Sequence, residues 1–248
     1  MPNLFDEDTN TQGVIVYGGE SSTDYGMVVS EAPAYERPKR KETIYNVPGR
    51  NGSILFQQDA RENVNRSYKV WLAEDSTHTL VEIVDAVEAW LNSQIGYIRL
   101  EDNFEPDVYR LAYYSGGDGF SNNMIQYGEA TLNFTCRPER FYKNAEAAVE
   151  VLNGDTMSNP TKFASKPLIH IEGTGIVTVS IGGETITAKD LVDYINIDCD
   201  RMDAYRLTSE NRNNKISGTF PTIKPGSNVI TITGSATKVE ITPRYFTI

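Results

Sequence analysis

Residues 79–94 read TLVEIVDAVEAWLNSQ, which is the one stretch of the chain with a clear helical repeat of apolar residues. The apolar side chains recur three or four residues apart and share one face of a helix: Leu80, Ile83, Val84, Val87 and Leu91. Thr79 and Glu82 have the spacing of a capping box, and Gly96 is placed to end the helix. We therefore predict one α-helix near residues 79–95 that packs its apolar face across a sheet.

Short segments in which apolar and polar residues alternate lie on both sides of this helix. In the first part of the chain these segments are residues 13–17, 26–29, 43–47, 53–57, 67–73, 96–100, 108–114 and 126–136. Turn residues separate them, and the glycine-rich run from Ser115 to Gly119 is interpreted as a hairpin tip. A helix among strands predicts a mainly β, α+β fold, whose first part is a β-sandwich-like domain with one α-helix.

The character of the sequence changes between Phe141 and Lys166. Residues 1–150 carry 13 Lys and Arg against 24 Asp and Glu, whereas residues 151–248 carry 10 of each. Beyond this point the segments are all of β type: residues 168–172, 176–181, 184–187, 194–197, 205–208, 229–233 and 238–242. Gly182-Gly183 between two of them is typical of a two-residue hairpin turn. We expect two domains, residues 1–150 and 151–248, the second a small β-sandwich.

No residue pattern in the chain is typical of an enzyme. Its two histidines, His78 and His170, lie in the turn before the helix and in an alternating strand. Neither is surrounded by a nucleophile elbow, a catalytic cysteine motif or an HExxH zinc motif. We interpret both as surface histidines and predict a protein that is not an enzyme and uses no cofactor.

The acidic residues and cysteines of the second half do not form a metal-binding pattern. Asp198, Asp200 and Asp203 are spaced like the start of a calcium loop, but the Gly expected at its sixth position and the Glu at its twelfth are missing. Cys136 and Cys199 are far apart in sequence and alternate with apolar neighbours. We therefore predict no metal site and expect the cysteines to be buried, structural thiols rather than a disulfide.

The net charge of −11 comes from the first part of the chain. A surface of this sign repels phosphate, so we expect no specific binding of nucleic acid. The short basic run at residues 37–41 is flanked by Glu36 and Glu42 and is interpreted as a solvated strand end. No apolar run approaches the ~18 residues that span a bilayer, so membrane insertion is not expected. The first residues lack the pattern of a secretory signal, which favours retention in a cytoplasm until assembly.

Three stretches around the helix stand out by their order. Residues 14–29 combine a short strand, glycine and a turn that contains Ser, Asp, an aromatic residue and Gly. Residues 47–53 read Val-Pro-Gly-Arg-Asn-Gly-Ser between two strands, and residues 132–141 form an apolar strand that ends in a Pro and an aromatic residue. Together these stretches resemble the distal tail protein (Dit) family of long-tailed bacteriophages, over about residues 13–145.

The resemblance implies that residues 1–150 are a belt domain that closes into a hexameric ring around the tail channel. Residues 151–248 would be a galectin-like β-sandwich on the outside. Such a hub would connect the tail tube protein to the tail-tip protein (a tail-associated lysin or fibre) and to a receptor-binding protein, in the baseplate of the virion after synthesis in the host cytoplasm. The turn residues become the candidates for the ring interface: Pro48, Gly49, Arg50, Asn51 and Gly52. The acidic bias of the first part suits a channel through which DNA slides, and ordinary solubility explains it equally well.

A carbohydrate-binding module that recognises the host cell surface is the alternative function, because a galectin-like architecture suggests sugar binding. Sugar sites usually place an aromatic ring under the sugar, yet both Trp71 and Trp90 lie in the first part. The second part also lacks the sequence pattern of true galectins, and its stacking candidates are Tyr194, Tyr205 and Tyr245. No pair of carboxylates can be singled out for a glycosidase.

Overall fold

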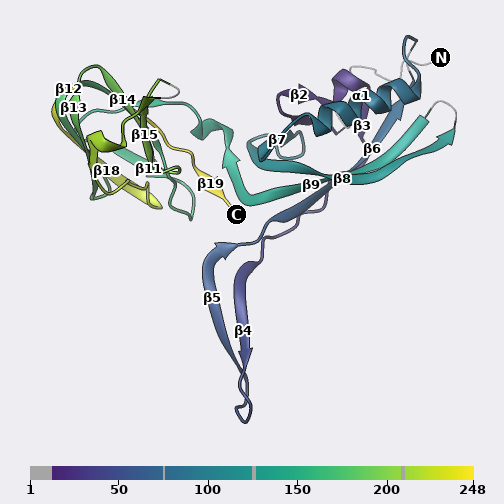
Figure 1. Cartoon of the computed structure of the whole chain (residues 1–248), viewed down its shortest axis with the longest axis horizontal. Helices are drawn as coiled ribbons and strands as arrows, with labels where there is room; N and C mark the ends of the chain where they lie inside the picture. The colour runs from purple at the N-terminus through teal and green to yellow at the C-terminus, as the bar shows by residue number, and fades with distance from the viewer. Residues whose placement is uncertain (1–12, 75, 125–126, 208–209) are drawn as a thin grey trace. The chain divides into compact units, whose positions relative to one another are not determined.

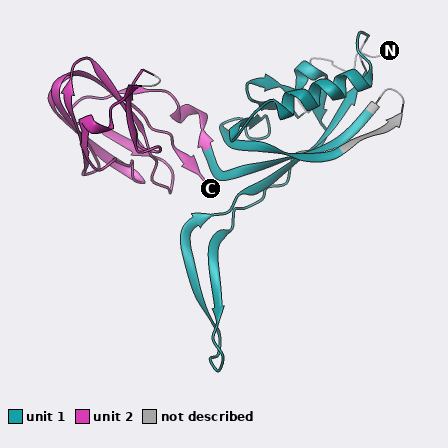
Figure 2. Cartoon of the chain, in the orientation of Figure 1, with its two compact units in different colours: residues 1–140, 248 teal, residues 141–247 magenta. Residues whose placement is uncertain are grey.

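The computed structural model describes residues 13–74, 76–124, 127–207 and 210–248, with only the backbone described for residues 119–124 and 127. The chain forms two compact units, which we describe separately (Figure 2). Unit 1 is Met1–Arg140 with Ile248, and unit 2 is Phe141–Thr247. The boundary between the units, after Arg140, comes earlier in the chain than the expected boundary between residues 150 and 151.

The first residues of unit 2 belong to that unit because they contact the C-terminal segment of the chain. The backbone N–H of Tyr142 donates to the carbonyl oxygen of Tyr245 at 2.9 Å. The rings of Phe141 and Phe246 lie 5.9 Å apart, and Phe163 stacks on Phe246 at 5.6 Å. These contacts join residues that are far apart in sequence, so a change of composition along the chain does not mark where they begin.

Unit 1 is built on one sheet with the strand order β2-β1-β7-β8-β9-β6-β3 (Figure 1). The strands are β1 (Ile15–Tyr17), β2 (Glu20–Ser21), β3 (Met27–Val29), β6 (Val64–Ala73), β7 (Ile98–Asp102), β8 (Val108–Met124) and β9 (Tyr127–Tyr142). On β6 the alternation is regular: Tyr68, Val70 and Leu72 are buried, whereas Ser67 and Lys69 between them are exposed. The apolar face of the sheet therefore forms one side of a core.

The helix α1 (Leu80–Asn92) covers that face, and it confirms the prediction of one helix near residues 79–95. Thr79 and Glu82 form the expected capping box. The helix ends before Gly96, because Ser93 caps it through hydrogen bonds from its backbone N–H and its hydroxyl to the carbonyl oxygen of Trp90. The Trp90 indole donates to the carbonyl oxygen of Tyr17 at 3.0 Å, which ties the helix to β1.

The glycine-rich run at residues 115–119 is not a hairpin tip, so that interpretation was wrong. These residues lie inside β8, and the connection to β9 falls at residues 125–126, outside the described residues. A Cβ on Gly117 would lie 2.1 Å from the carbonyl oxygen of Thr131 on β9. Glycine is needed there because another backbone approaches closely, and not because the chain turns.

A two-stranded ribbon leaves the body of unit 1 (Figure 1). Its strands are β4 (Arg40–Asn46) and β5 (Ser53–Arg61), which pair with each other and with no other strand in the described part of the chain. We call residues 40–61 the arm. The sequence predicted both strands, at residues 43–47 and 53–57, but the structure makes them longer.

Unit 2 is a second, all-β body with its own core. Its elements are η2 (Lys143–Ala145), β10 (Val149–Glu150), β11 (Thr156–Asn159), β12 (Leu168–Ile181), β13 (Glu184–Leu191), β14 (Tyr194–Asp198), β15 (Asp203–Arg206), β16 (Glu210–Asn211), η3 (Asn213–Lys215), β17 (Ile216–Gly218), β18 (Gly226–Thr242) and β19 (Phe246–Thr247). The long strands β12 and β18 pair with each other along most of their length. The first half of β12 also pairs with β14 and the second half with β13, as expected for strands that bend between two layers.

The bends explain why two predicted strands became one. Residues 168–172 and 176–181 were predicted separately, but they are the two ends of β12, joined across a register shift near Gly173. A Cβ on Gly173 would lie 2.4 Å from the carbonyl oxygen of Ser235 on β18. The predicted turn at Gly182-Gly183 is confirmed, with φ of 55° and 90°. The prediction of a mainly β fold with one helix thus holds for the described residues.

Candidate assembly site

The arm carries large apolar side chains that its own chain leaves exposed. Ile44, Tyr45, Leu55 and Phe56 are 57%, 55%, 50% and 59% exposed. The cross-strand pairs place Thr43 opposite Phe56, with Tyr45 next along β4 on the same face. The rings of Tyr45 and Phe56 meet edge to face, with centroids 5.6 Å apart. Ile44 and Leu55 pair on the opposite face.

A ribbon of two strands has no third layer in which to bury such side chains. An isolated hairpin is at best marginally stable in water, and contiguous exposed apolar residues on a monomer usually mark an interaction surface. The arm therefore has the properties of an element that a partner covers.

The five residues singled out from the sequence lie together at the tip of the arm, and all are exposed. The turn is stabilised by a hydrogen bond from the N–H of Arg50 to the carbonyl oxygen of Val47 at 3.2 Å. Gly49 and Gly52 have φ of 80° and 78°. Asn51 does not share this conformation, because the residues other than glycine with positive φ lie elsewhere in the described chain. Pro48 and its neighbours thus shape the tip.

We expect Gly52→Val to destabilise the tip by about 1–2 kcal/mol, because a β-branched residue is strained at positive φ. No atom lies within 4 Å of a Cβ at this position, so backbone strain alone accounts for the effect. Hydrogen exchange of the β4–β5 amides measures it. Asn51→Val, in the same turn at ordinary φ, is the matched control, and equal exchange in the two variants would contradict this account of the turn.

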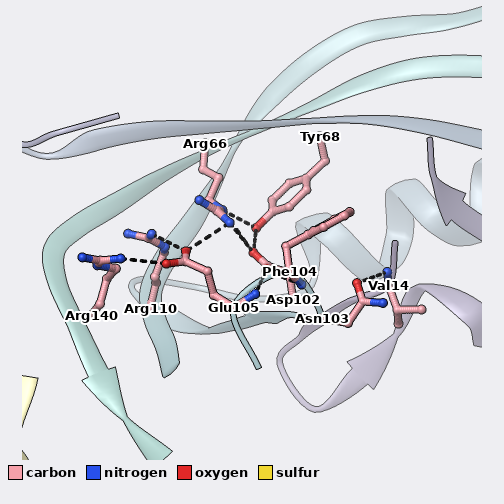
Figure 3. A network of polar contacts seen from close by, with 9 residues as sticks. All are labelled: Val14, Arg66, Tyr68, Asp102, Asn103, Phe104, Glu105, Arg110 and Arg140. Carbon is pink, nitrogen blue, oxygen red and sulfur yellow. Dashed lines mark hydrogen bonds and ion pairs between the residues drawn. The ribbon is translucent and has the colours of Figure 1, made fainter. Parts of the chain in front are cut away.

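Unit 1 contains a largely buried network of ionic side chains (Figure 3). Asp102, at the end of β7, accepts hydrogen bonds from the Arg66 guanidinium at 2.7 Å and from the Tyr68 hydroxyl at 2.7 Å. Its other oxygen accepts the backbone N–H groups of Phe104 and Glu105 at 3.1 and 2.9 Å. Every side of this buried carboxylate is thus occupied by a donor.

Glu105 forms the second centre of the network. Its carboxylate lies 2.7 Å from Arg110 of β8, 2.7 Å from Arg140 of β9 and 3.2 Å from Arg66 of β6. Burial alone would raise the pKa of Glu105, but the hydrogen bond and charge of Arg110, with help from Arg140 and Arg66, hold it below its usual value. The network joins four strands, β6 to β9, and the β7–β8 connection by charges that are largely out of water.

The network lies beside the two chain segments at the base of the arm. The N–H of Asn65, at the start of β6, donates to the Glu36 carboxylate at 3.1 Å, and the Arg66 guanidinium lies 5.7 Å from the centre of the Tyr35 ring. Next to the arm itself, the N–H of Glu62 donates to the carbonyl oxygen of Lys39 at 2.9 Å. The network therefore fixes the strand into which the arm leads.

Sequence reasoning missed this network. The available signal was the alternation of inward and outward residues along β6. Arg66 falls on an inward position, as Val64 and Tyr68 do. A charged residue at an inward position needs a buried partner. The partners Asp102 and Glu105 come from a distant part of the chain, so the sequence does not identify them.

The residues considered for catalysis or metal binding have structural contacts. His170 Nδ1 lies 2.7 Å from the Asn196 side chain, and His78 is exposed in the turn before α1. Asp198 is buried and accepts both guanidinium N–H groups of Arg244, at 2.8 and 3.1 Å. Within the described residues no group of three His, Cys, Asp or Glu side chains is placed to hold a metal ion.

Neither cysteine forms a disulfide. Cys136 and Cys199 are free and buried, which confirms the prediction of buried thiols. Burial raises the pKa of Cys136 to about 11 and that of Cys199 to about 12. In the described ranges no helix is long and apolar enough to cross a bilayer.

Two of the three tyrosines considered for sugar stacking share a face of the sheet, because Tyr194 lies two residues before Asn196, which pairs with Tyr205 on β15. Tyr245 precedes β19 and packs against the core of unit 2. The Tyr194 ring is already contacted by the Arg206 guanidinium, at 5.5 Å from its centre, and by the His170 ring at 5.3 Å.

The stability of unit 2 should fall in acid because of Asp198. Burial would raise the pKa of Asp198, but hydrogen bonds from Arg244 and from the N–H groups of Arg201 and Asp200 hold it below its usual value. A lowered pKa contributes stability that is complete above the unfolded pKa of about 3.9 and is lost as the pH falls through the folded value. Thermal unfolding between pH 7 and 2 should therefore show a loss below about pH 4 that Asp198→Asn reduces.

The control for this measurement is Asp190→Asn. Asp190 pairs with Lys215 at 2.9 Å, but its side chain is 75% exposed. Solvent screens such a pair, so its removal should change the pH dependence little. An identical effect of the two substitutions would contradict the role given to Asp198.

No protein-family model and no curated protein sequence matches the chain. Among solved structures it is similar to the Dit protein of phage SPP1, with a TM-score of 0.75 and 14% identity over 95% of this chain and 99% of that chain. That protein is described as a paradigm of the hub of the adsorption apparatus in phages that infect Gram-positive bacteria.

The chain is also similar to a protein in the phage p2 baseplate in its activated conformation. With strontium and with calcium, the TM-scores are 0.52 and 0.50 at 13% identity, over 93% of this chain and 97% of that chain. These likenesses support the resemblance seen in the three sequence stretches, and they show that the chain has the fold of a phage distal tail (Dit) protein.

Proposed function

We propose that this chain is a structural hub of a phage tail tip and not an enzyme. Six copies form a ring around the tail channel, with residues 1–150 supplying the contacts and residues 151–248 facing outward. The fold shared with the SPP1 Dit protein supports this role, because that protein is described as an adsorption hub. The similarity to a protein of the phage p2 baseplate points to the same part of a virion.

The observation that carries the proposal is the exposed apolar arm. A ring of identical subunits needs a head-to-tail interface, in which one patch meets a different patch on the next copy. A projecting ribbon supplies one of these patches. A stable interface buries on the order of 800 Å² per partner, and two strands with apolar side chains on both faces are large enough to contribute much of it.

The partners follow from the same role. The ring binds the tail tube protein on one side and the tail-tip protein on the other, and a receptor-binding protein attaches to this assembly in the baseplate. The protein is synthesised in the host cytoplasm and functions in the virion. The residues at the tip of the arm, Pro48 to Gly52, belong to the ring contact.

Electron microscopy of intact particles labelled at the C-terminus tests this function. We expect label at the junction of the tail tube and the tip, in a ring of six. Light scattering coupled to size exclusion gives a second reading, since a ring of six differs about sixfold in mass from a monomer. Label at any other place in the particle, or a particle without this protein, would contradict the proposal.

A further inference from the structure

A groove of about 590 Å³ lies between the first half of α1 and η1 (Ser22–Tyr25) in unit 1. Its lining is largely apolar, and the apolar residues come from four parts of the chain: Val14, Tyr25, Val28, Ile83 and Ala86. This volume is within the range of about 300–1,000 Å³ that is found for ligand pockets, so the groove is large enough to receive several side chains of a partner.

The lining of this groove also carries acidic side chains. Asp24, Glu74 and Glu82 line it, and no lysine or arginine is among its described lining residues. The backbone holds these carboxylates in place: Asp24 accepts the N–H of Ser21 at 3.0 Å, and Glu82 accepts the N–H of Thr79 at 2.8 Å. The N-terminus of α1 contributes only about half a positive charge, so the lining of the groove remains negative.

The arm is complementary to this groove. Residues 40–61 carry four Lys and Arg against two Asp and Glu, in a chain whose net charge is −11. Phe56 lies opposite Thr43, and strand alternation places Tyr45 on the same face. The arm thus presents a pair of exposed aromatic rings on a ribbon whose net charge is positive.

We propose that the groove between α1 and η1 receives the Tyr45–Phe56 face of the arm of a second copy of this chain. The inference rests on the proposed ring and names the surface that accepts the arm. None of the described residues that line the groove belongs to the arm of the same chain. Donor arm and acceptor groove are different patches of one subunit, which is the head-to-tail arrangement that a ring needs.

Disulfide trapping between two separately prepared proteins tests this contact. One carries Tyr45→Cys on the arm and the other Ala86→Cys in the groove. Phe56 keeps one ring on the arm, and the native Cys136 and Cys199 do not compete because they are 0% and 2% exposed. Mixing the two under mild oxidation should give a dimer whose cross-linked peptide joins positions 45 and 86, identified by mass spectrometry.

Val81→Cys is the matched control on the same helix. Val81 is 68% exposed and does not line the groove. We expect at least about tenfold less cross-linking of position 45 to position 81 than to position 86, since only the latter lies in the contact. A second pair of variants tests the groove without cysteines. Ala86→Arg adds bulk and positive charge to the groove and should weaken association by at least about tenfold. Val81→Arg, outside the groove, should leave association unchanged.

The outcomes separate this inference from the proposed function. Rings that form normally with Ala86→Arg, or that cross-link equally at positions 81 and 86, overturn the groove and leave the ring intact. Absence of any oligomer of the unmodified protein in light scattering and in particles overturns both.

Discussion

Replacing Tyr45 and Phe56 together by serine should abolish ring assembly and leave the folded body of each subunit unchanged. Both side chains are more than half exposed on the arm, so their removal takes nothing from the core of unit 1. Truncation of an aromatic hot-spot residue costs about 2 kcal/mol or more. Two such losses weaken each contact on the order of a thousandfold.

Light scattering across a concentration series measures this effect, and thermal unfolding of the monomer checks that the body stays folded. Val192→Ser with Ile176→Ser is the matched control, because these residues are 78% and 60% exposed in unit 2. Assembly should survive that pair of changes. A double variant of Tyr45 and Phe56 that still forms rings at the original concentration would show that the arm is not the interface.

Asp102→Asn should destabilise unit 1 by about 3–5 kcal/mol, because it removes one partner of a buried ion pair and leaves Arg66 with Glu105, whose charge is shared with Arg110 and Arg140. The Arg66 and Asp102 side chains are only 3% and 5% exposed. Asparagine keeps an oxygen that can accept the N–H groups of Phe104 and Glu105, so the substitution tests the charge rather than the turn. Denaturant unfolding measures the loss.

Two further variants make this prediction specific. Lys69→Met removes a pair with Glu31 whose side chains are 62% and 64% exposed, and this should cost less than about 1 kcal/mol. Arg66→Met combined with Asp102→Leu removes both charges but leaves the Tyr68 hydroxyl and the N–H groups of Phe104 and Glu105 without their acceptor, so it should recover only part of the lost stability. A loss in Asp102→Asn no larger than that in Lys69→Met would mean that the network is not a buried anchor.

Loss of the network should also loosen the base of the arm. Arg66 contacts Tyr35, and its neighbour Asn65 binds Glu36, both on the segment that leads into β4. Hydrogen exchange should therefore increase at the start of β6 in Asp102→Asn before the unit unfolds.

The helix and most strands of this protein could be predicted because their signals are local. The capping box of Thr79 and Glu82 needs only residues three apart, and the apolar face of α1 follows from its own spacing. The alternation along β6 likewise reports which residues face a core. The turn at Gly182-Gly183 was found for the same reason, since glycine alone tolerates both φ values without strain.

The glycines of β8 and β12 show where this reasoning ends. Gly117 and Gly173 look like turn residues in sequence, yet each lies where the backbone of another strand approaches, at Thr131 and Ser235. Only the pairing of distant strands distinguishes a glycine that turns the chain from one that admits a neighbour. The boundary at Arg140 has a similar origin, because Phe141 and Tyr142 bind the C-terminal segment.

The sequence by itself determined that the chain is mainly β with one helix, that residues 47–52 form a turn between two strands, and that the acidic excess lies in the first part. These properties depend on neighbouring residues and on composition. The tertiary structure alone decided that β4 and β5 leave the sheet as an exposed arm, and that Arg66, Asp102 and Glu105 meet beneath its base. Burial and ion pairing depend on which distant segments come together, and that is settled only when the whole chain has packed.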